Sequence, residues 1–133
     1  MKKNVLTLSL VFCFAWLAIP VYAQEKLEEF MNENTPEERA QMQTDYMTET
    51  LALTSAQVPT IHEVNLKYAR KMQSAYNSGG GKLQKLKGMK RVGEEKDKEL
   101  KSNLTEAQYA LYQTNKEQMK EKIRARAKER RKG

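Results

Sequence analysis

The side chains that carry most enzyme chemistry are scarce in this chain, which contains one histidine and one cysteine. His62 stands beside Glu63, and no second histidine is available to complete a ligand set. Zinc and copper sites usually recruit several His or Cys ligands, so one histidine with scattered glutamates does not predict a metal site. We therefore interpret His62 as a partly exposed helix residue.

Two other kinds of reactive site lack their sequence patterns. A nucleophilic triad would need the same histidine, and no Gly-x-Ser-x-Gly context occurs. The run Gly79-Gly80-Gly81-Lys82 does not have the spacing of a phosphate-binding P-loop. We expect a protein that is not an enzyme and that needs no metal or cofactor.

A five-residue pattern occurs twice, as Leu-Thr-Ser-Ala-Gln at 53–57 and as Leu-Thr-Glu-Ala-Gln at 104–108. Each copy predicts a helix start, because the threonine hydroxyl can accept a hydrogen bond from the first turn and the glutamine can reach back to the cap. The leucine before each cap is expected to pack on Val58 or Tyr109 as a hydrophobic staple. The residues predicted to set the architecture in this way are Leu53, Thr54, Gln57, Leu104, Thr105 and Gln108.

The segments around these motifs have helical periodicity. Thr35-Pro36-Glu37-Glu38 combines a capping box with proline at the first helical position, which predicts a helix to about Ala52. Pro59 lacks the N–H that would bond to Ser55, so we expect a kinked first turn and a regular helix from near Thr60. The expected apolar stripes are Met42, Tyr46 and Leu51; Ile61, Val64, Tyr68, Met72 and Ala75; Leu83, Leu86, Met89, Val92 and Leu100; and Tyr109, Tyr112, Met119, Ile123 and Ala127.

No segment alternates like a strand, and three glycines at 79–81 break the second helix from the third. The predicted fold is therefore all-α, with about four helices in an elongated, dimeric helical-hairpin or cradle arrangement. We divide the chain into a signal peptide at 1–23, a flexible segment without clear period at 24–34, and a helical domain with a basic tail at 35–133.

The first residues have the three parts of a secretory signal. Lys2 and Lys3 precede an apolar run from Val5 to Ile19, and small residues at 21 and 23 suit signal peptidase. An uncleaved membrane anchor is the alternative, since the run approaches a membrane-spanning length. Pro20 and the cleavage-like triplet favour cleavage, which would remove the only cysteine and place the mature chain in the periplasm.

Charge is divided unevenly along the rest of the chain. Residues 24–81 hold five basic and nine acidic side chains, whereas residues 82–133 hold seventeen and eight. Such asymmetry indicates a polyanionic partner or a basic tail, and nucleic acid does not suit an exported protein. Acidic protein surfaces, anionic lipid at the membrane surface and cell-envelope polymers remain as partners, with the alternative that the tail is a solvated helix end. The candidate contacts for clients or polyanions are Met47, which falls off its stripe, and Arg124, Arg126, Lys128, Arg130 and Arg131.

The paired Leu-Thr-x-x-Gln motifs, each before a helix rich in Lys, Glu and Met, resemble those of the Spy/CpxP family of small periplasmic helical proteins. The resemblance implies a cradle-shaped homodimer that binds unfolded or partly folded envelope proteins without ATP. It also implies an alternative role, as an adaptor or inhibitor of a sensor protein, with a link to metal stress. Pro59, the glycine break and the basic tail depart from the family pattern.

Overall fold

The computed structural model describes residues 21–133, so the first twenty residues of the predicted signal peptide lie outside the described part of the chain. Within it the fold is all-helical, which confirms the predicted fold class, with five helices where about four were expected. The helices are α1 (Val21–Glu33), α2 (Pro36–Leu51), α3 (Gln57–Asn77), α4 (Lys82–Asn103) and α5 (Glu106–Lys132).

The additional helix is α1, which occupies the segment for which we expected flexibility and no helical period. Leu27, Phe30 and Met31 are spaced by three and one, and therefore lie on one side of a helix. Met31 is buried, and Phe30 packs against the core. The short apolar side of α1 is thus stabilised by tertiary contact, and three apolar residues among the eleven at 24–34 gave no clear period in the sequence.

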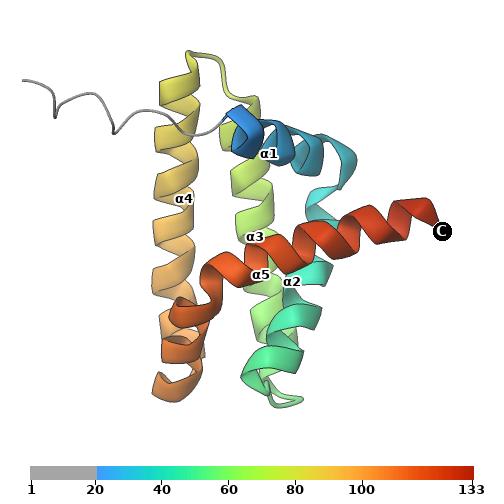
Figure 1. Ribbon diagram of the computed structural model, residues 1–133. Helices are drawn as coiled ribbons and strands as arrows, with labels where there is room; N and C mark the ends of the chain where they lie inside the picture. Colours follow the sequence, from blue (N-terminus) through green and yellow to red (C-terminus); the bar gives the residue numbers. More distant parts are fainter. Residues whose placement is uncertain (1–20) are drawn as a thin grey trace, which may run out of the picture.

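The helices form a hairpin crossed by the C-terminal helix. α3 and α4 run antiparallel to each other and are joined by residues 78–81, where Gly80 has a φ of 124° that favours glycine. α2 packs on α3, and α5 leaves the lower end of α4 in Figure 1 and crosses α2. α1 lies near the opposite end of the hairpin from the loop between α4 and α5 (Figure 1).

One core lies where α2, α3 and α5 meet the end of α4. Its members are Met42, Tyr46, Met47, Leu51, Leu53, Ile61, Val64, Tyr68, Leu100, Leu104, Tyr112, Met119, Ile123 and Ala127. The stripes of α2 and α5 are therefore mostly buried, as is the first part of the α3 stripe. α4 differs, because Leu100 is its one fully buried residue and Leu83 is 60% exposed.

Two local expectations were wrong. Met47, which we expected to be exposed, is 0% exposed, because α3 and α5 cover different sides of α2 and widen its buried sector beyond one stripe. α3 begins at Gln57 and not near Thr60. Pro59 is the third residue of this helix, where the backbone N–H groups have no partner within a helix, so its missing donor costs little.

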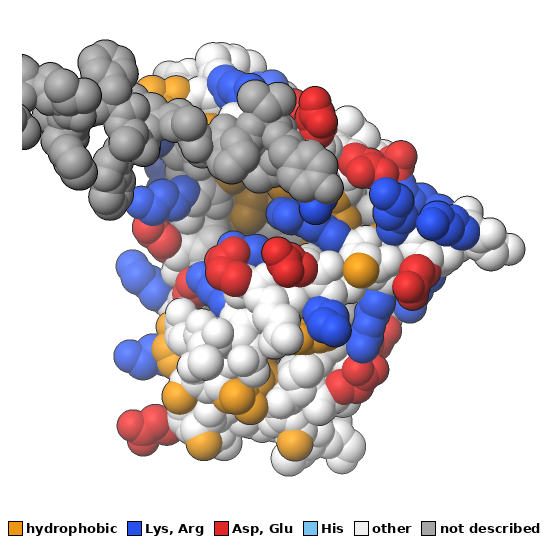
Figure 2. Space-filling view, viewed as in Figure 1, with side chains coloured by type: hydrophobic (Ala, Val, Ile, Leu, Met, Phe, Trp, Pro, Cys, Tyr) orange, Lys and Arg blue, Asp and Glu red, His pale blue; other side chains and the backbone are white. Residues whose placement is uncertain are grey.

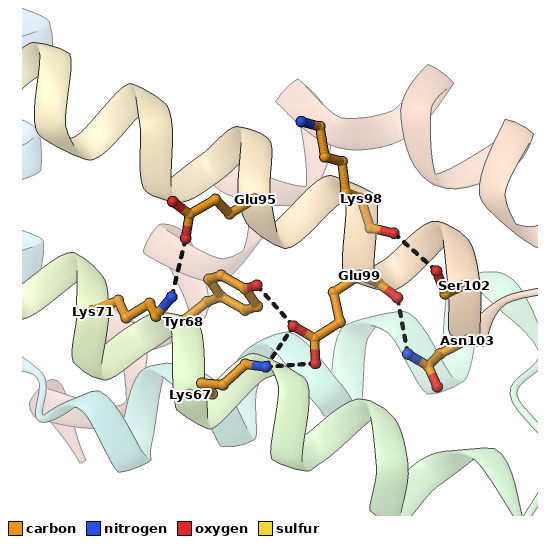
Figure 3. A network of polar contacts seen from close by, with 8 residues as sticks. All are labelled: Lys67, Tyr68, Lys71, Glu95, Lys98, Glu99, Ser102 and Asn103. Atoms are coloured by element: carbon orange, nitrogen blue, oxygen red, sulfur yellow. Dashed lines mark hydrogen bonds and ion pairs between the residues drawn. The ribbon is translucent and has the colours of Figure 1, made fainter.

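A polar network joins α3 to α4 on the outside of the hairpin (Figure 3). Lys67 and Tyr68 both donate to the carboxylate of Glu99, at 2.6 and 2.7 Å, and Lys71 donates to Glu95 at 3.0 Å. The bonds from Lys67 and Tyr68 lower the pKa of Glu99, and the bond from Lys71 lowers that of Glu95. Burial, followed by the bond to Glu99, raises the pKa of Tyr68 to about 12.

This network predicts loss of stability in acid. A carboxyl group with a lowered pKa in the folded state stabilises the fold above its unfolded pKa, and this contribution disappears as the pH falls through the folded pKa. We expect the Tm to fall between about pH 5 and pH 3, and to fall less in Glu99→Gln, which cannot titrate there. Circular dichroism melting against pH measures this, with Glu121→Gln on the exposed side of α5 as the control. An equal acid dependence in Glu99→Gln and the unchanged chain would contradict it.

Candidate functional site

Both copies of the repeated motif form reciprocal bonds between threonine and glutamine, but only the second caps its helix as predicted. Thr105 is the N-cap of α5, whereas Thr54 precedes a two-residue turn and the N-cap of α3 is Ala56, which has no side-chain capping bond. In the first copy the Thr54 N–H donates to Gln57 Oε1 at 3.0 Å, and the Gln57 N–H donates to Thr54 Oγ1 at 3.2 Å. Thr105 and Gln108 repeat this arrangement with the same two distances. Leu53 and Leu104 are buried in the core, and Val58 and Tyr109 pack against it, as hydrophobic staples require.

The two copies also bind each other directly. Gln57 Nε2 donates to Gln108 Oε1 at 2.8 Å, and Gln108 Nε2 donates to Gln57 Oε1 at 3.0 Å. Each amide also reaches a backbone oxygen at the end of another helix, that of Asn103 for Gln57 and that of Leu51 for Gln108. We call this paired-amide arrangement the glutamine clasp. It joins the ends of α2 and α4 to the starts of α3 and α5, which gives the repetition of the motif a structural reason.

Removal of either threonine hydroxyl should weaken one helix start. We expect Thr54→Ala and Thr105→Ala each to lower the free energy of unfolding by about 1 kcal/mol, the usual contribution of an N-cap side chain. Urea titration followed by circular dichroism measures both. Thr114→Ala is the control, because its hydroxyl bonds only to the Ala110 carbonyl within an exposed helix. Unchanged stability in both cap variants would rule out this account of the motif.

The clasp predicts that the two glutamines are energetically coupled. Gln57→Ala and Gln108→Ala each leave the partner amide without its reciprocal bond, so the double variant should lose less stability than the two single variants together. We expect a coupling free energy of about 1 kcal/mol in a double-mutant cycle measured by urea unfolding. Additive losses would mean that each glutamine serves only its own cap.

The basic tail is partly neutralised by ion pairs within the protein. Arg126 pairs with Glu49 at 2.9 Å, Arg130 lies 4.0 Å from Asp45, and Arg131 pairs with Glu29 and Glu33 of α1. Three of the five tail cations predicted to contact a client therefore have carboxylate neighbours on α1 or α2. Lys128 is exposed, and Arg124 is half-buried. The acidic first half and the basic second half of the sequence partly compensate each other across this interface.

The first half of α4 is the basic surface that remains uncompensated. Residues 82–93 contain five Lys or Arg side chains and no Asp or Glu. Within residues 21–133 none of the five forms an ion pair, whereas the carboxylates that follow them on α4, Glu95, Asp97 and Glu99, pair with cations of α3 and α5. These cations surround the exposed Leu83 and the half-buried Leu86 and Met89. The members of this surface, which we call the α4 basic face, are Lys82, Leu83, Lys85, Lys87, Lys90 and Arg91.

An open cavity of about 600 Å³ lies among all five helices. In Figure 2 this face of the protein is recessed, with hydrophobic side chains inside and Lys or Arg side chains beside them. Two cations on its wall were not singled out by the sequence analysis. Arg39 is 2% exposed, and Lys96 donates to Gln43 Oε1 at 2.6 Å. The pKa of Lys96 is lowered to about 8. Desolvation is the main cause and the charge of Lys116 adds to it, whereas the charge of Asp97 acts in the opposite direction.

A polar group on the same wall fixes α5 against α4. The Tyr112 hydroxyl donates to Asp97 Oδ1 at 2.9 Å, and the Lys116 ammonium pairs with the other oxygen of the same carboxylate. Burial, followed by the charge of Asp97, raises the pKa of Tyr112. Asp97 is therefore already compensated by partners within the chain, and Lys96 has only the neutral amide of Gln43 as a hydrogen-bond partner.

The sequence did contain a signal for both cavity cations. Arg39 precedes Met42 by three residues on the stripe of α2, and Lys96 stands four residues from both Val92 and Leu100 on the stripe of α4. A cation on an apolar stripe is unusual, because burial of a charge is costly unless it is compensated.

His62 is half-buried, and its Nδ1 lies 3.3 Å from Thr44 Oγ1. No group of three or more His, Cys, Asp or Glu side chains in residues 21–133 is arranged to hold a metal ion. In the same part of the chain, no helix has the length and apolar character needed to cross a membrane.

Comparison with known proteins gives one match. Residues 23–112 match the model of a family described as a domain of unknown function, DUF4890. This span includes both motifs and ends within α5. No curated protein and no solved structure matches the chain.

Proposed function

The chain belongs to the DUF4890 family, and we propose that it is an exported, non-enzymatic protein that holds partly folded envelope proteins without ATP. The α4 basic face is the observation that carries this proposal. It combines five cations that lack ion pairs within the described chain with an exposed leucine and a half-covered apolar stripe. A partly folded chain presents acidic and apolar segments together, which are the groups that this face complements.

The physical chemistry of the face suits weak and reversible capture. Charge attraction acts over about a Debye length of 8–10 Å and speeds encounter without much affinity. The exposed Leu83 side chain can then contact different apolar segments. No covalent step is needed, and folding of the client would itself end the contact.

Two sequence features support a function outside the cytoplasm. The first is the signal-like segment at 1–23, and the second is the resemblance of the paired motifs to the Spy/CpxP family. In our proposal the glutamine clasp serves as a rigid frame, and a homodimer would join two such frames into a cradle. The clasp has no catalytic role in this function.

Suppression of aggregation by light scattering, without ATP, tests the proposal. We expect the protein, purified from cells that produce the full chain, to suppress aggregation of a reduced or heated test protein near equimolar ratio, and to do so less well in high salt. Replacement of Lys82, Lys85 and Lys87 by Gln should weaken suppression several-fold. The matched control replaces Lys122, Lys128 and Lys132, three exposed lysines of α5, by Gln.

Two results would contradict the proposal. One is an absence of suppression at several-fold excess from a sample whose circular dichroism is fully helical. The other is an equal loss in the α4 and α5 lysine variants, which would indicate an effect of net charge alone. The first result would favour the alternative, an adaptor or inhibitor of a sensor, and a pull-down from envelope extract would then recover one specific partner.

A further inference from the structure

The cavity contains a buried cation without a carboxylate partner. Arg39 is 2% exposed, and its guanidinium contacts Met31 Sδ, the Ala69 carbonyl oxygen and Gln73 Oε1, which are all neutral. Its Nε is buried and has no hydrogen-bond partner within the described chain. A buried guanidinium normally pairs with an anion, because neutral acceptors do not fully offset its desolvation.

A second cation lies close to the first. Lys96 bonds to Gln43, which follows Arg39 by four residues and therefore lies on the same side of α2. Lys96 has no ion-pair partner within residues 21–133, since the nearby Asp97 is occupied by Tyr112 and Lys116. Arg39 and Lys96 thus leave positive charge uncompensated at one region of the cavity wall.

Much of the remaining wall is apolar and adaptable. Four of the six methionines that follow the signal segment line it, and they are Met31, Met72, Met89 and Met119. Leu86, Met89, Gly93 and Lys96 follow each other at steps of three and four on one face of α4. This face extends about 15 Å from the cation to the leucine at the helical rise.

The net charge of the wall is positive. Six cations line the cavity, which are Arg39, Lys90, Lys96, Lys116, Lys120 and Arg124. The acids there are Glu94 and Asp97. A volume of about 600 Å³ lies within the range of small-molecule sites. The apolar wall offers few partners to the polar backbone of a peptide, whereas a hydrocarbon chain needs none.

We propose that this cavity binds a single-chain anionic amphiphile, a fatty acid, with its carboxylate at Arg39 and Lys96 and its hydrocarbon chain along the methionine-lined wall. The carboxylate would accept from the unpartnered Arg39 Nε and from the Lys96 ammonium, two charge-assisted hydrogen bonds. The site does not depend on the α4 basic face acting on protein clients, so either proposal can fail without the other.

Gly93 allows the cavity to be filled without disturbing α4. It lines the cavity, and a Cβ atom built there meets nothing within 4 Å. Gly93→Leu therefore places a large side chain in open space at a helical position that also gains helix propensity. Gly93→Ala gives the same backbone benefit with little bulk and serves as its matched control.

Isothermal titration of delipidated protein with dodecanoate, below its micelle concentration, tests the proposal. We expect one dodecanoate per chain, no binding of acetate, and at least tenfold weaker binding of dodecyltrimethylammonium, which has the same tail and the opposite charge. Gly93→Leu should abolish dodecanoate binding and Gly93→Ala should retain it. Lys96→Met should weaken it about tenfold, the usual effect of one lost charge-assisted bond, while Lys98→Met on the exposed side of α4 should not.

Equal binding of the two dodecyl compounds would overturn the proposal, because the cavity would then be an apolar recess without anion recognition. Absence of dodecanoate binding by a fully helical sample would overturn it as well, as would binding that survives both Gly93→Leu and Lys96→Met. If Gly93→Leu does not fold, Lys96→Met against Lys98→Met still decides the question. None of these measurements uses a protein client, so they are independent of the aggregation assay.

Discussion

The reciprocal amide pair of Gln57 and Gln108 is the interaction on which the arrangement of the helices depends. Each amide oxygen accepts from the threonine N–H of its own motif and from the other glutamine, so the same two groups cap helices and join motifs. The amide nitrogens extend this to the final turns of α2 and α4. A polar network that is only partly hydrogen-bonded costs more free energy than an apolar contact, so loss of one of these bonds would weaken the others. Together they hold the α2–α3 turn and the α4–α5 turn in one relative position.

Charge has a second organising role. α5 crosses α2 so that arginines near its end meet carboxylates of α1 and α2. These pairs are exposed and individually weak, but together they reduce the repulsion within a tail that holds eight basic residues. One consequence is that fewer positive charges of the tail are available to an outside partner than its composition indicates. The α4 basic face contains no acidic residue and its cations form no ion pair within residues 21–133, so it keeps its charge available.

The α4 basic face and the cavity share the first half of α4, which α3 covers on one side only. Its outer side presents lysines and Leu83, whereas Leu86, Met89 and Gly93 turn toward the cavity. The thin packing of this segment would cost stability in a protein that used α4 only as a structural support. The uncompensated Arg39 and Lys96 also indicate a role beyond support of the fold, because a purely structural core would favour apolar residues at those stripe positions.

The sequence by itself determined the features that arise within one helix or one turn. The caps at Thr35 and Thr105, the stripes of α2 and α5, and the glycine break are all visible in it, because capping and periodicity act over three or four residues. Tertiary structure decided the rest. Burial of Met47 needed a second helix against α2, α1 needed a core to pack on, and the Gln57–Gln108 pair needed two turns 51 residues apart to meet. The pairing of the tail with α1 and α2, and the placement of Arg39 and Lys96 in one cavity, followed from the same long-range packing. Local rules contain no information on which faces meet, because that choice is made by the total free energy of burial and charge compensation across the whole chain.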